Sequence, residues 1–272
     1  MTHQIFTKAF NGKAKNVVIG MLHVPALPGC PKHKLPMPKI IDHVLREADV
    51  YAEQKIDSMI IENMHDVPYV KNTEMGPEIT ACMTAVASHL RQNFPELPLG
   101  VQMLTAANKE ALAVAKAAGL NYIRGEGFVF SHVGDEGWID SNAGPLLRYR
   151  KAIDAEDILV FTDIKKKHSS HAVTSDVSLS MTAKAAEFFL TDGVIVTGEE
   201  TGSATDPTDF QSLLDAIDLP ILIGSGVDDT NIHEYVGASA FIIGSHFKVN
   251  GCWSNPVCPE RVKNFMSKLE SY

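Results

Sequence analysis

Polar and charged side chains recur at the ends of short apolar runs in this sequence. The candidates for catalytic chemistry are His23, Glu62, Arg124, Asp163 and Lys165. A histidine or a carboxylate there could transfer a proton, and an arginine or a lysine could stabilise developing negative charge. Because alternate residues of a strand share a face, Asp163 and Lys165 are expected to point the same way. The alternative is that such charges only satisfy one another, for example in a buried pair of Glu62 with Arg124.

A second set of residues is suited to holding an anion. ILIGSGV (221–227) and FIIGSHF (241–247) both break at Gly-Ser, and EETGSATD (199–206) is also rich in small polar residues. Glycine lets backbone N–H groups approach an anion closely, and serine adds a hydroxyl donor. The predicted phosphate-binding residues are Gly198, Gly202, Ser203, Gly224, Ser225, Gly226, Gly244 and Ser245. The alternative is that the glycines only permit tight turns and close packing.

A metal centre is a further possibility. His23, Glu62, Asp163 and His168 all stand at or just after the ends of apolar runs, but no HxH or HExxH spacing accompanies them. The four cysteines form no CxxC pair. We therefore predict no cofactor, and a divalent metal held by these four residues stays open as an alternative.

Eight apolar runs carry the candidate residues, and each is too short for a helix. They are VVIGMLHV (17–24), SMIIENM (58–64), LGVQML (99–104), YIRGEG (122–127), ILVFTDI (158–164), GVIVTG (193–198), ILIGSG (221–226) and FIIGSH (241–246). Continuous apolar runs of this length are typical of parallel strands that are buried on both faces. Segments with helical spacing and good helix formers separate them.

This alternation predicts an α/β fold, a single (β/α)8 TIM barrel over residues 16–272 that follows an N-terminal extension, residues 1–15. A doubly wound open sheet is the alternative, but the first run is not followed by GxGxxG. In a barrel, the C-terminal ends of all strands meet at one face, which would gather the candidate residues. The stretch from Phe128 to Leu147 predicts a long loop after the fourth strand, and long loops in compact domains are often functional.

The composition of the chain limits the kinds of partner that it is expected to bind. The formal net charge of -9 disfavours nucleic acid, and no apolar segment is long enough to span a membrane. A small phosphorylated ligand is the expected partner, and a homo-oligomer is possible. The expected location is the cytoplasm, although Lys8, Lys13 and Lys15, with no acidic residue among them, leave organellar targeting open.

Several segments resemble the BtpA family, also named BtpA/SgcQ, from about Val17 to Val262. They include GMLHVPALPGCP (20–31), IENMHDVPY (61–69), DIKKKH (163–168), VTGEETG (196–202) and WSNPVCPERV (253–262). The resemblance implies a barrel of the ribulose-phosphate-binding type, but it transfers no catalytic residue. The founding name of the family refers to photosystem I biogenesis, and other members are described as nucleosidases or sugar-metabolism proteins. Glu126 stands where many members have a neutral amide.

Two functions follow as hypotheses. The first is an enzyme that acts on a phosphorylated sugar or a nucleotide-derived substrate, as a nucleosidase-like hydrolase or a sugar-phosphate lyase or isomerase. The second is a non-catalytic assembly or stability factor of the BtpA type that acts through protein contacts. Charged side chains at five strand ends favour the enzyme, because an assembly factor has no need of them.

Overall fold

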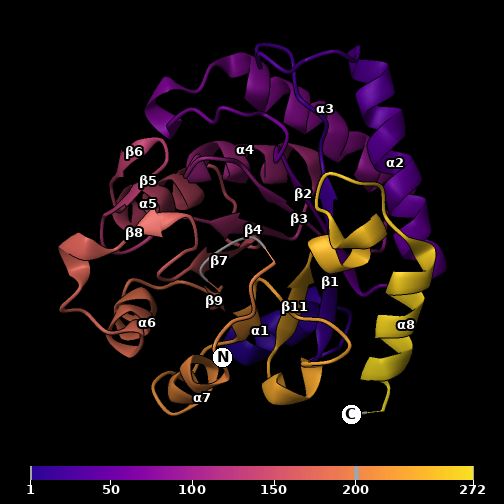
Figure 1. The fold of residues 1–272 in the computed structure, drawn as a ribbon. Helices are drawn as coiled ribbons and strands as arrows, with labels where there is room; N and C mark the ends of the chain where they lie inside the picture. The colour runs from indigo at the N-terminus through magenta and orange to yellow at the C-terminus, as the bar shows by residue number, and fades with distance from the viewer. Residues whose placement is uncertain (1, 199–201, 272) are drawn as a thin grey trace.

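In the computed structural model, which describes residues 2–198 and 202–271, parallel strands close into an eight-stranded barrel (Figure 1). Around the barrel the strands are β1 (Val17–His23), β2 (Ser58–Glu62), β3 (Leu99–Gln102), β4 (Tyr122–Gly125), β7 (Leu159–Asp163), β9 (Gly193–Val196), β10 (Ile221–Ile223) and β11 (Ala240–Ile243). The last strand pairs with β1, which closes the sheet. The predicted barrel is therefore confirmed, and the open sheet is wrong.

Helices cover the outside of the barrel. They are α2 (Met37–Glu53), α3 (Pro77–Asn93), α4 (Asn108–Ala118), α5 (Ala143–Ala152), α6 (Leu179–Phe188), α7 (Pro207–Leu214) and α8 (Pro259–Leu269). Local sequence fixes several of their ends. The Ser178 and Asp206 side chains cap α6 and α7 by accepting hydrogen bonds from backbone N–H groups, and α4 ends at Gly119 in the left-handed conformation. Between β10 and β11 only a 3-10 turn forms, Ile232–Tyr235.

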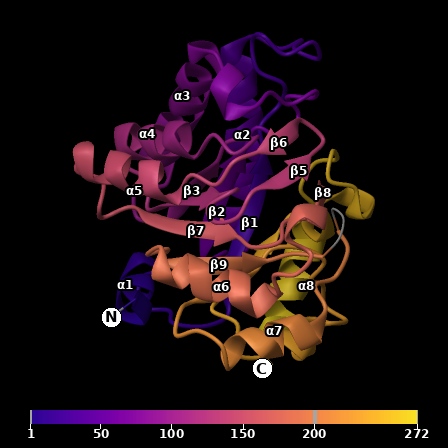
Figure 2. The ribbon, with the colours of Figure 1, turned by 90° about the vertical axis from the view of Figure 1, so that its left-hand side faces the viewer.

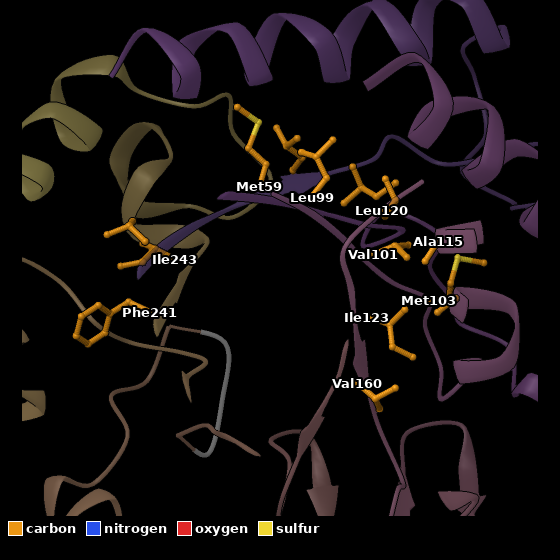
Figure 3. Packing of buried hydrophobic residues seen from close by; sticks show 14 of the residues in the cluster. Met59, Leu99, Val101, Met103, Ala115, Leu120, Ile123, Val160, Phe241 and Ile243 are labelled. Atoms are coloured by element: carbon orange, nitrogen blue, oxygen red, sulfur yellow. The ribbon is translucent and has the colours of Figure 1, made fainter. Parts of the chain in front are cut away.

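The strands divide the apolar residues into two layers. Outward residues such as Val101 and Ile123 pack under the helices, against Ala115 of α4 among others (Figure 3). The inward residues form a separate cluster inside the barrel, which includes Ile19, Ile60, Tyr122, Leu159 and Phe161. Along β1, β4 and β7 the inward positions change from apolar at the start to His23, Arg124 and Asp163 at the end. The period of two thus places the site directly above the core.

Residues 2–15, predicted as part of an N-terminal extension, pack against the inside of the barrel. They contain helix α1 (Thr2–Ala9), which buries Phe6, and Phe10, which follows the helix, is also buried. The Phe10 ring lies 5.4 Å from that of Tyr122, the first residue of β4, and 6.3 Å from that of Phe161. This segment therefore fills the N-terminal end of the barrel, the end opposite the candidate residues.

The long loop after β4 folds into a hairpin of β5 (His132–Gly134) and β6 (Gly137–Ile139). Strand β5 also pairs with β8 (Ser169–Ser170), which follows β7 (Figure 2). The resulting small sheet joins the loops of two neighbouring barrel strands. It brings Asp135 and Glu136, at the tip of the hairpin, to the mouth of the barrel.

The described helices include none that is long and apolar enough to cross a membrane.

The burial of Phe10 at the N-terminal end of the barrel predicts that its side chain stabilises the fold. Phe10→Ala removes a buried ring that packs on three others, so we expect a loss of about 3–5 kcal/mol in the free energy of unfolding. Ile5→Ala on the neighbouring helix α1 is the matched control, because Ile5 is 44% exposed and its substitution should cost about 0.5 kcal/mol or less. Denaturant unfolding measures both variants. Equal losses would show that α1 is only loosely attached.

Candidate active site

A cavity of about 490 Å³ opens at the C-terminal ends of the barrel strands. Five strands contribute their last inward residue or one close to it: His23, Glu62, Gln102, Arg124 and Asp163. The loops after β10 and β11, Trp253 and Arg261 complete the walls. The barrel therefore brings together four of the five predicted catalytic residues, which lie 140 positions apart in the sequence from first to last.

Arg124 and Asp163 form a buried pair between the neighbouring strands β4 and β7. The guanidinium donates from Nε to Oδ2 and from Nη2 to Oδ1, both at 2.8 Å. Burial alone would lower the pKa of Arg124, but the charge of Asp163 raises it. Both Asp163 oxygens are thus engaged, so this carboxylate orients the arginine and does not fit the predicted acid–base role. The alternative pair of Glu62 with Arg124 is not formed.

Glu62 is the carboxyl group that the cavity leaves without a strong partner. It is 7% exposed, and its side chain makes no hydrogen bond within the described residues. Burial raises its pKa from 4.5 to about 7, against the opposing charges of Arg124 and Lys167. A carboxyl group that is half protonated near neutral pH can both donate and accept a proton.

His23 faces Glu62 across a short gap. Its Nδ1 lies 2.9 Å from the carbonyl oxygen of Trp253 and must donate to it, so Nε2 is the acceptor nitrogen. Nε2 lies 3.7 Å from Oε2 of Glu62. Burial and the charge of Lys248 lower the pKa of His23 to about 3. At neutral pH the pair is therefore a neutral imidazole beside an exchangeable carboxyl proton.

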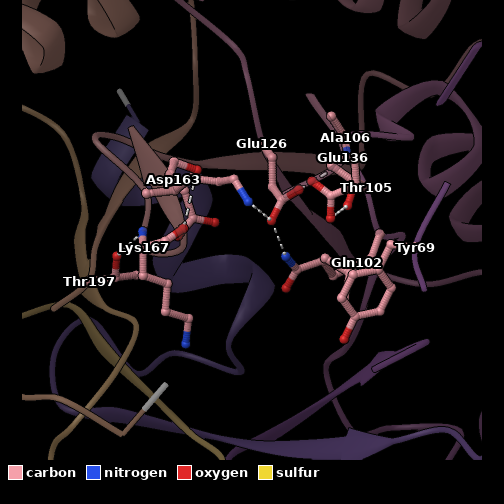
Figure 4. Close-up of polar contacts among 12 residues, drawn as sticks. Tyr69, Gln102, Thr105, Ala106, Glu126, Glu136, Asp163, Lys167 and Thr197 are labelled. Atoms are coloured by element: carbon pink, nitrogen blue, oxygen red, sulfur yellow. Dashed lines mark hydrogen bonds and ion pairs between the residues drawn. The ribbon is translucent and has the colours of Figure 1, made fainter. Parts of the chain in front are cut away.

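Glu126 has a different environment from Glu62. It accepts hydrogen bonds from Gln102 Nε2 at 3.2 Å and from the backbone N–H of Ala106 at 3.1 Å, and it pairs with Lys166 at 3.4 Å (Figure 4). Burial would raise its pKa, but Lys166 and the other partners lower it. Glu126 is therefore a fixed negative charge, whereas Glu62 can exchange a proton.

Lys165 does not line this cavity, so the structure does not bring it together with the other four predicted catalytic residues. Strand β7 ends at Asp163, and Lys165 adopts a φ of 48°, so the alternation of faces stops before it. Its amino group donates instead to the carbonyl oxygen of Thr174 at 2.8 Å. Lys166 and Lys167 line the cavity in its place. The period-two argument failed because it assumed two more residues of strand.

The predicted phosphate residues separate into two groups. Six of them line the cavity: Gly202, Gly224, Ser225, Gly226, Gly244 and Ser245. Gly198 and Ser203 do not, and instead help to hold the loops after β9 and β10 together. The Ser225 hydroxyl accepts from the N–H of Gly198 and donates to the Ser203 carbonyl, both at 2.9 Å. Part of EETGSATD, residues 199–201, lies outside the described residues.

Gly226 has a structural reason to be glycine. Its φ is +68°, and a Cβ there would lie 2.2 Å from the Ser203 carbonyl oxygen. Gly198 and Gly226 are therefore both needed for the close packing of these loops. The backbone N–H groups of Gly226 and Val227 nevertheless make no hydrogen bond within the described residues and border the cavity, so they remain available to an anion.

Two wall residues were missed by the sequence analysis. Trp253 packs its ring on those of His65 and His23, at centroid distances of 4.9 and 5.9 Å, and it lines the cavity at the mouth of the barrel. Arg261 on α8 donates from Nε to the His246 carbonyl and borders the cavity. Both come from the segment WSNPVCPERV, which was noticed only for its family resemblance.

The metal alternative finds little support in the geometry. Among residues 2–198 and 202–271 no group of three or more histidine, cysteine or acidic side chains is placed to hold a metal ion. Of the four candidate ligands, His23 and Glu62 lie 3.7 Å apart, and the Asp163 oxygens are engaged by Arg124.

The chain is similar over most of its length to one protein family and to several individual proteins. Residues 14–271 match the model of the BtpA family, which confirms the resemblance seen in the sequence. An uncharacterized mitochondrial protein of Caenorhabditis elegans is 48% identical over 275 residues, covering 100% of this chain and 99% of the relative. The photosystem I biogenesis protein BtpA of Synechocystis is 30% identical over 256 residues, covering 93% and 88%.

Solved structures agree on the fold. N-(5'-phosphoribosyl)anthranilate isomerase from Pyrococcus furiosus aligns with a TM-score of 0.56 at 13% identity, covering 94% of this chain and 100% of that one. Orotidine 5'-phosphate decarboxylase from Pyrococcus horikoshii aligns with a TM-score of 0.56 at 12% identity, covering 93% and 99%. At such low identity these matches establish the barrel alone.

The raised pKa of Glu62 predicts a pH-dependent stability. The folded state holds this proton more tightly than the unfolded chain does, so stability is lost as pH rises through about 7. Glu62→Gln mimics the protonated form. We expect the variant to match the wild type near pH 5 and to exceed it by about 2 kcal/mol at pH 8. Denaturant unfolding across this range tests it, with the exposed Glu53→Gln as control. A difference that does not change with pH would contradict the assignment.

Proposed function

The chain belongs to the BtpA family, and from its cavity we propose that it is an enzyme acting on a small phosphorylated sugar or nucleotide-derived compound. The observation that carries this proposal is Glu62, a buried carboxyl group without a hydrogen-bond partner in the described chain, at the wall of a cavity. A buried carboxyl group without a hydrogen bond destabilises the folded protein. Residues that are kept despite such a loss of stability are often found at functional sites.

Glu62 is the acid–base residue of the proposed reaction. With a pKa of about 7 it is present in both protonation states at neutral pH, which is the condition for efficient proton transfer. His23 lies beside it with an acceptor Nε2, and can accept a hydrogen bond from the substrate or from the carboxyl proton. Arg124, oriented by Asp163, is placed to stabilise negative charge that develops on the substrate.

The phosphate end of the substrate is assigned to the loops after β10 and β11. The N–H groups of Gly226 and Val227, the Ser245 hydroxyl and the Arg261 guanidinium border this side of the cavity. The fold adds support, because loops after the last two barrel strands commonly bind phosphate. The two structural neighbours also carry a phosphoribosyl or a 5'-phosphate group in the names of their substrates.

A ligand screen tests this proposal. We expect ribose 5-phosphate or a nucleoside monophosphate to raise the melting temperature of the full chain more than ribose or the free nucleoside does. Glu62→Gln should keep this stabilisation and lose about 10²–10⁴-fold in turnover of the stabilising compound, followed by mass spectrometry of the products. Glu53→Gln is the control for the same chemical change on the surface. If no phosphate ester stabilises the protein, the proposal fails.

A protein-assembly role is the second candidate. It is favoured by the name of the Synechocystis relative and by apolar side chains exposed around α6, where Phe188 is 81% and Met181 54% exposed. In cells that lack their own family member, this role predicts that Glu62→Gln restores the missing function and that Met181→Ser with Phe188→Ser does not. The enzymatic proposal predicts the reverse.

Location and oligomeric state stay predictions. The C. elegans relative is named as mitochondrial, which is in keeping with the organellar alternative for this chain. The exposed residues of α6 offer a surface for a homo-oligomer.

A further inference from the structure

Three consecutive lysines after β7 have three different environments. Lys165 donates to the Thr174 carbonyl outside the cavity. Lys166 pairs with Glu126. The amino group of Lys167 makes no hydrogen bond or ion pair within the described residues, and Figure 4 shows it directed away from the Glu126 cluster, with no dashed line to its nitrogen.

Lys167 is held in place through its backbone. Its N–H donates to the Thr197 hydroxyl at 3.1 Å, which fastens the loop after β7 to the end of β9. The side chain borders the cavity together with Glu62 and Arg124. Glu62 and Asp163 are close enough to act on its charge, but no carboxylate of the described residues lies within ion-pair distance of its amino group. A half-buried lysine that is anchored at the backbone and borders a cavity in this way is arranged to meet a ligand.

The charge state of Lys167 suits a nucleophile. Burial and the neighbouring Arg124 lower its pKa from 10.5 to about 8. At pH 7 roughly a tenth of its amino groups are therefore neutral, compared with well under a thousandth for an ordinary lysine. A lysine that served only to hold a phosphate would gain nothing from this loss of charge, and the proposed function already assigns the phosphate to the loops after β10 and β11.

We propose that Lys167 forms a covalent imine with the carbonyl carbon of the substrate, so that the substrate is a phosphorylated aldehyde or ketone. This inference rests on the proposed function and narrows its substrate class. The protonated imine on Lys167 then accepts the electron pair that is released when a proton is removed, or a bond is broken, next to that carbon.

The atoms of this step balance without a further reactant. The lone pair of the neutral Lys167 nitrogen attacks the carbonyl carbon, and the carbonyl oxygen becomes a hydroxyl group as a proton passes to it from the nitrogen. The C–O bond then breaks, Glu62 supplies the proton that lets the oxygen leave as water, and the nitrogen lone pair forms the C=N bond. The product is a protonated imine with an ionised Glu62, which is then available as a base.

Reductive trapping tests the imine. The full chain is incubated with glyceraldehyde 3-phosphate or dihydroxyacetone phosphate and cyanoborohydride at pH 7, and the modified lysine is identified by peptide mass spectrometry. We expect one adduct, on Lys167. Lys167→Arg keeps the charge and should lose the adduct, whereas Lys165→Arg, altered outside the cavity, should keep it. Because the step needs a neutral Lys167 and a protonated Glu62, the trapping rate should pass through a maximum between pH 7 and 8. Glu62→Gln should slow the trapping.

The outcomes separate this inference from the proposed function. If the triose phosphates stabilise the chain against heat but leave Lys167 unmodified, the imine is wrong while phosphate binding stands. If they neither stabilise nor modify it, both proposals fail for this substrate class. Modification spread equally over surface lysines, or retained in Lys167→Arg, also overturns the inference. Circular dichroism melting of each variant shows that a lost adduct does not come from misfolding.

Discussion

The buried pair of Arg124 and Asp163 determines how the rest of the site is charged. Two strands that neighbour each other in the barrel, β4 and β7, supply the two groups, and two hydrogen bonds of 2.8 Å fix the guanidinium plane. Because a buried charge is tolerated only when it is paired, this arginine is held by one carboxylate and cannot also neutralise the others fully. The remaining carboxylates must find other partners or stay protonated.

The other two buried carboxyl groups, Glu62 and Glu126, differ in whether they have a partner for their negative charge. Glu126 finds Lys166, Gln102 and a backbone N–H, so it stays ionised despite burial. Among the described residues, Glu62 has a neutral histidine at 3.7 Å as its one ion-pair contact, and burial outweighs the charges of Arg124 and Lys167 in setting its pKa. Two carboxyl groups with different protonation behaviour in one cavity are a recurrent basis of acid–base catalysis. The difference arises from the partners, since both residues are glutamates at strand ends.

The sequence predicted the barrel and most of its charged residues because one physical rule links them. Buried parallel strands are continuous apolar runs, and their alternation carries the inward face from Ile60 to Glu62 and from Tyr122 to Arg124. That rule ends where the strand ends, which is why Lys165 was misplaced. It also says nothing about the C-terminal segment, so Trp253 and Arg261, which reach the cavity from far along the chain, could not be found by strand periodicity.

Pairings between side chains were equally out of reach, because they depend on register. The sequence suggested Glu62 of β2 as a partner for Arg124. Strand β7, which pairs directly with β4, instead places Asp163 within hydrogen-bond distance of the guanidinium. Glycines were ambiguous for a related reason: Gly226 lines the cavity, and a Cβ there would lie 2.2 Å from the Ser203 carbonyl oxygen. One residue thus serves loop packing and belongs to the cavity wall. Close packing and anion binding by the Gly-Ser segments are therefore compatible, because a glycine that lets two loops meet can still offer its backbone N–H to a ligand.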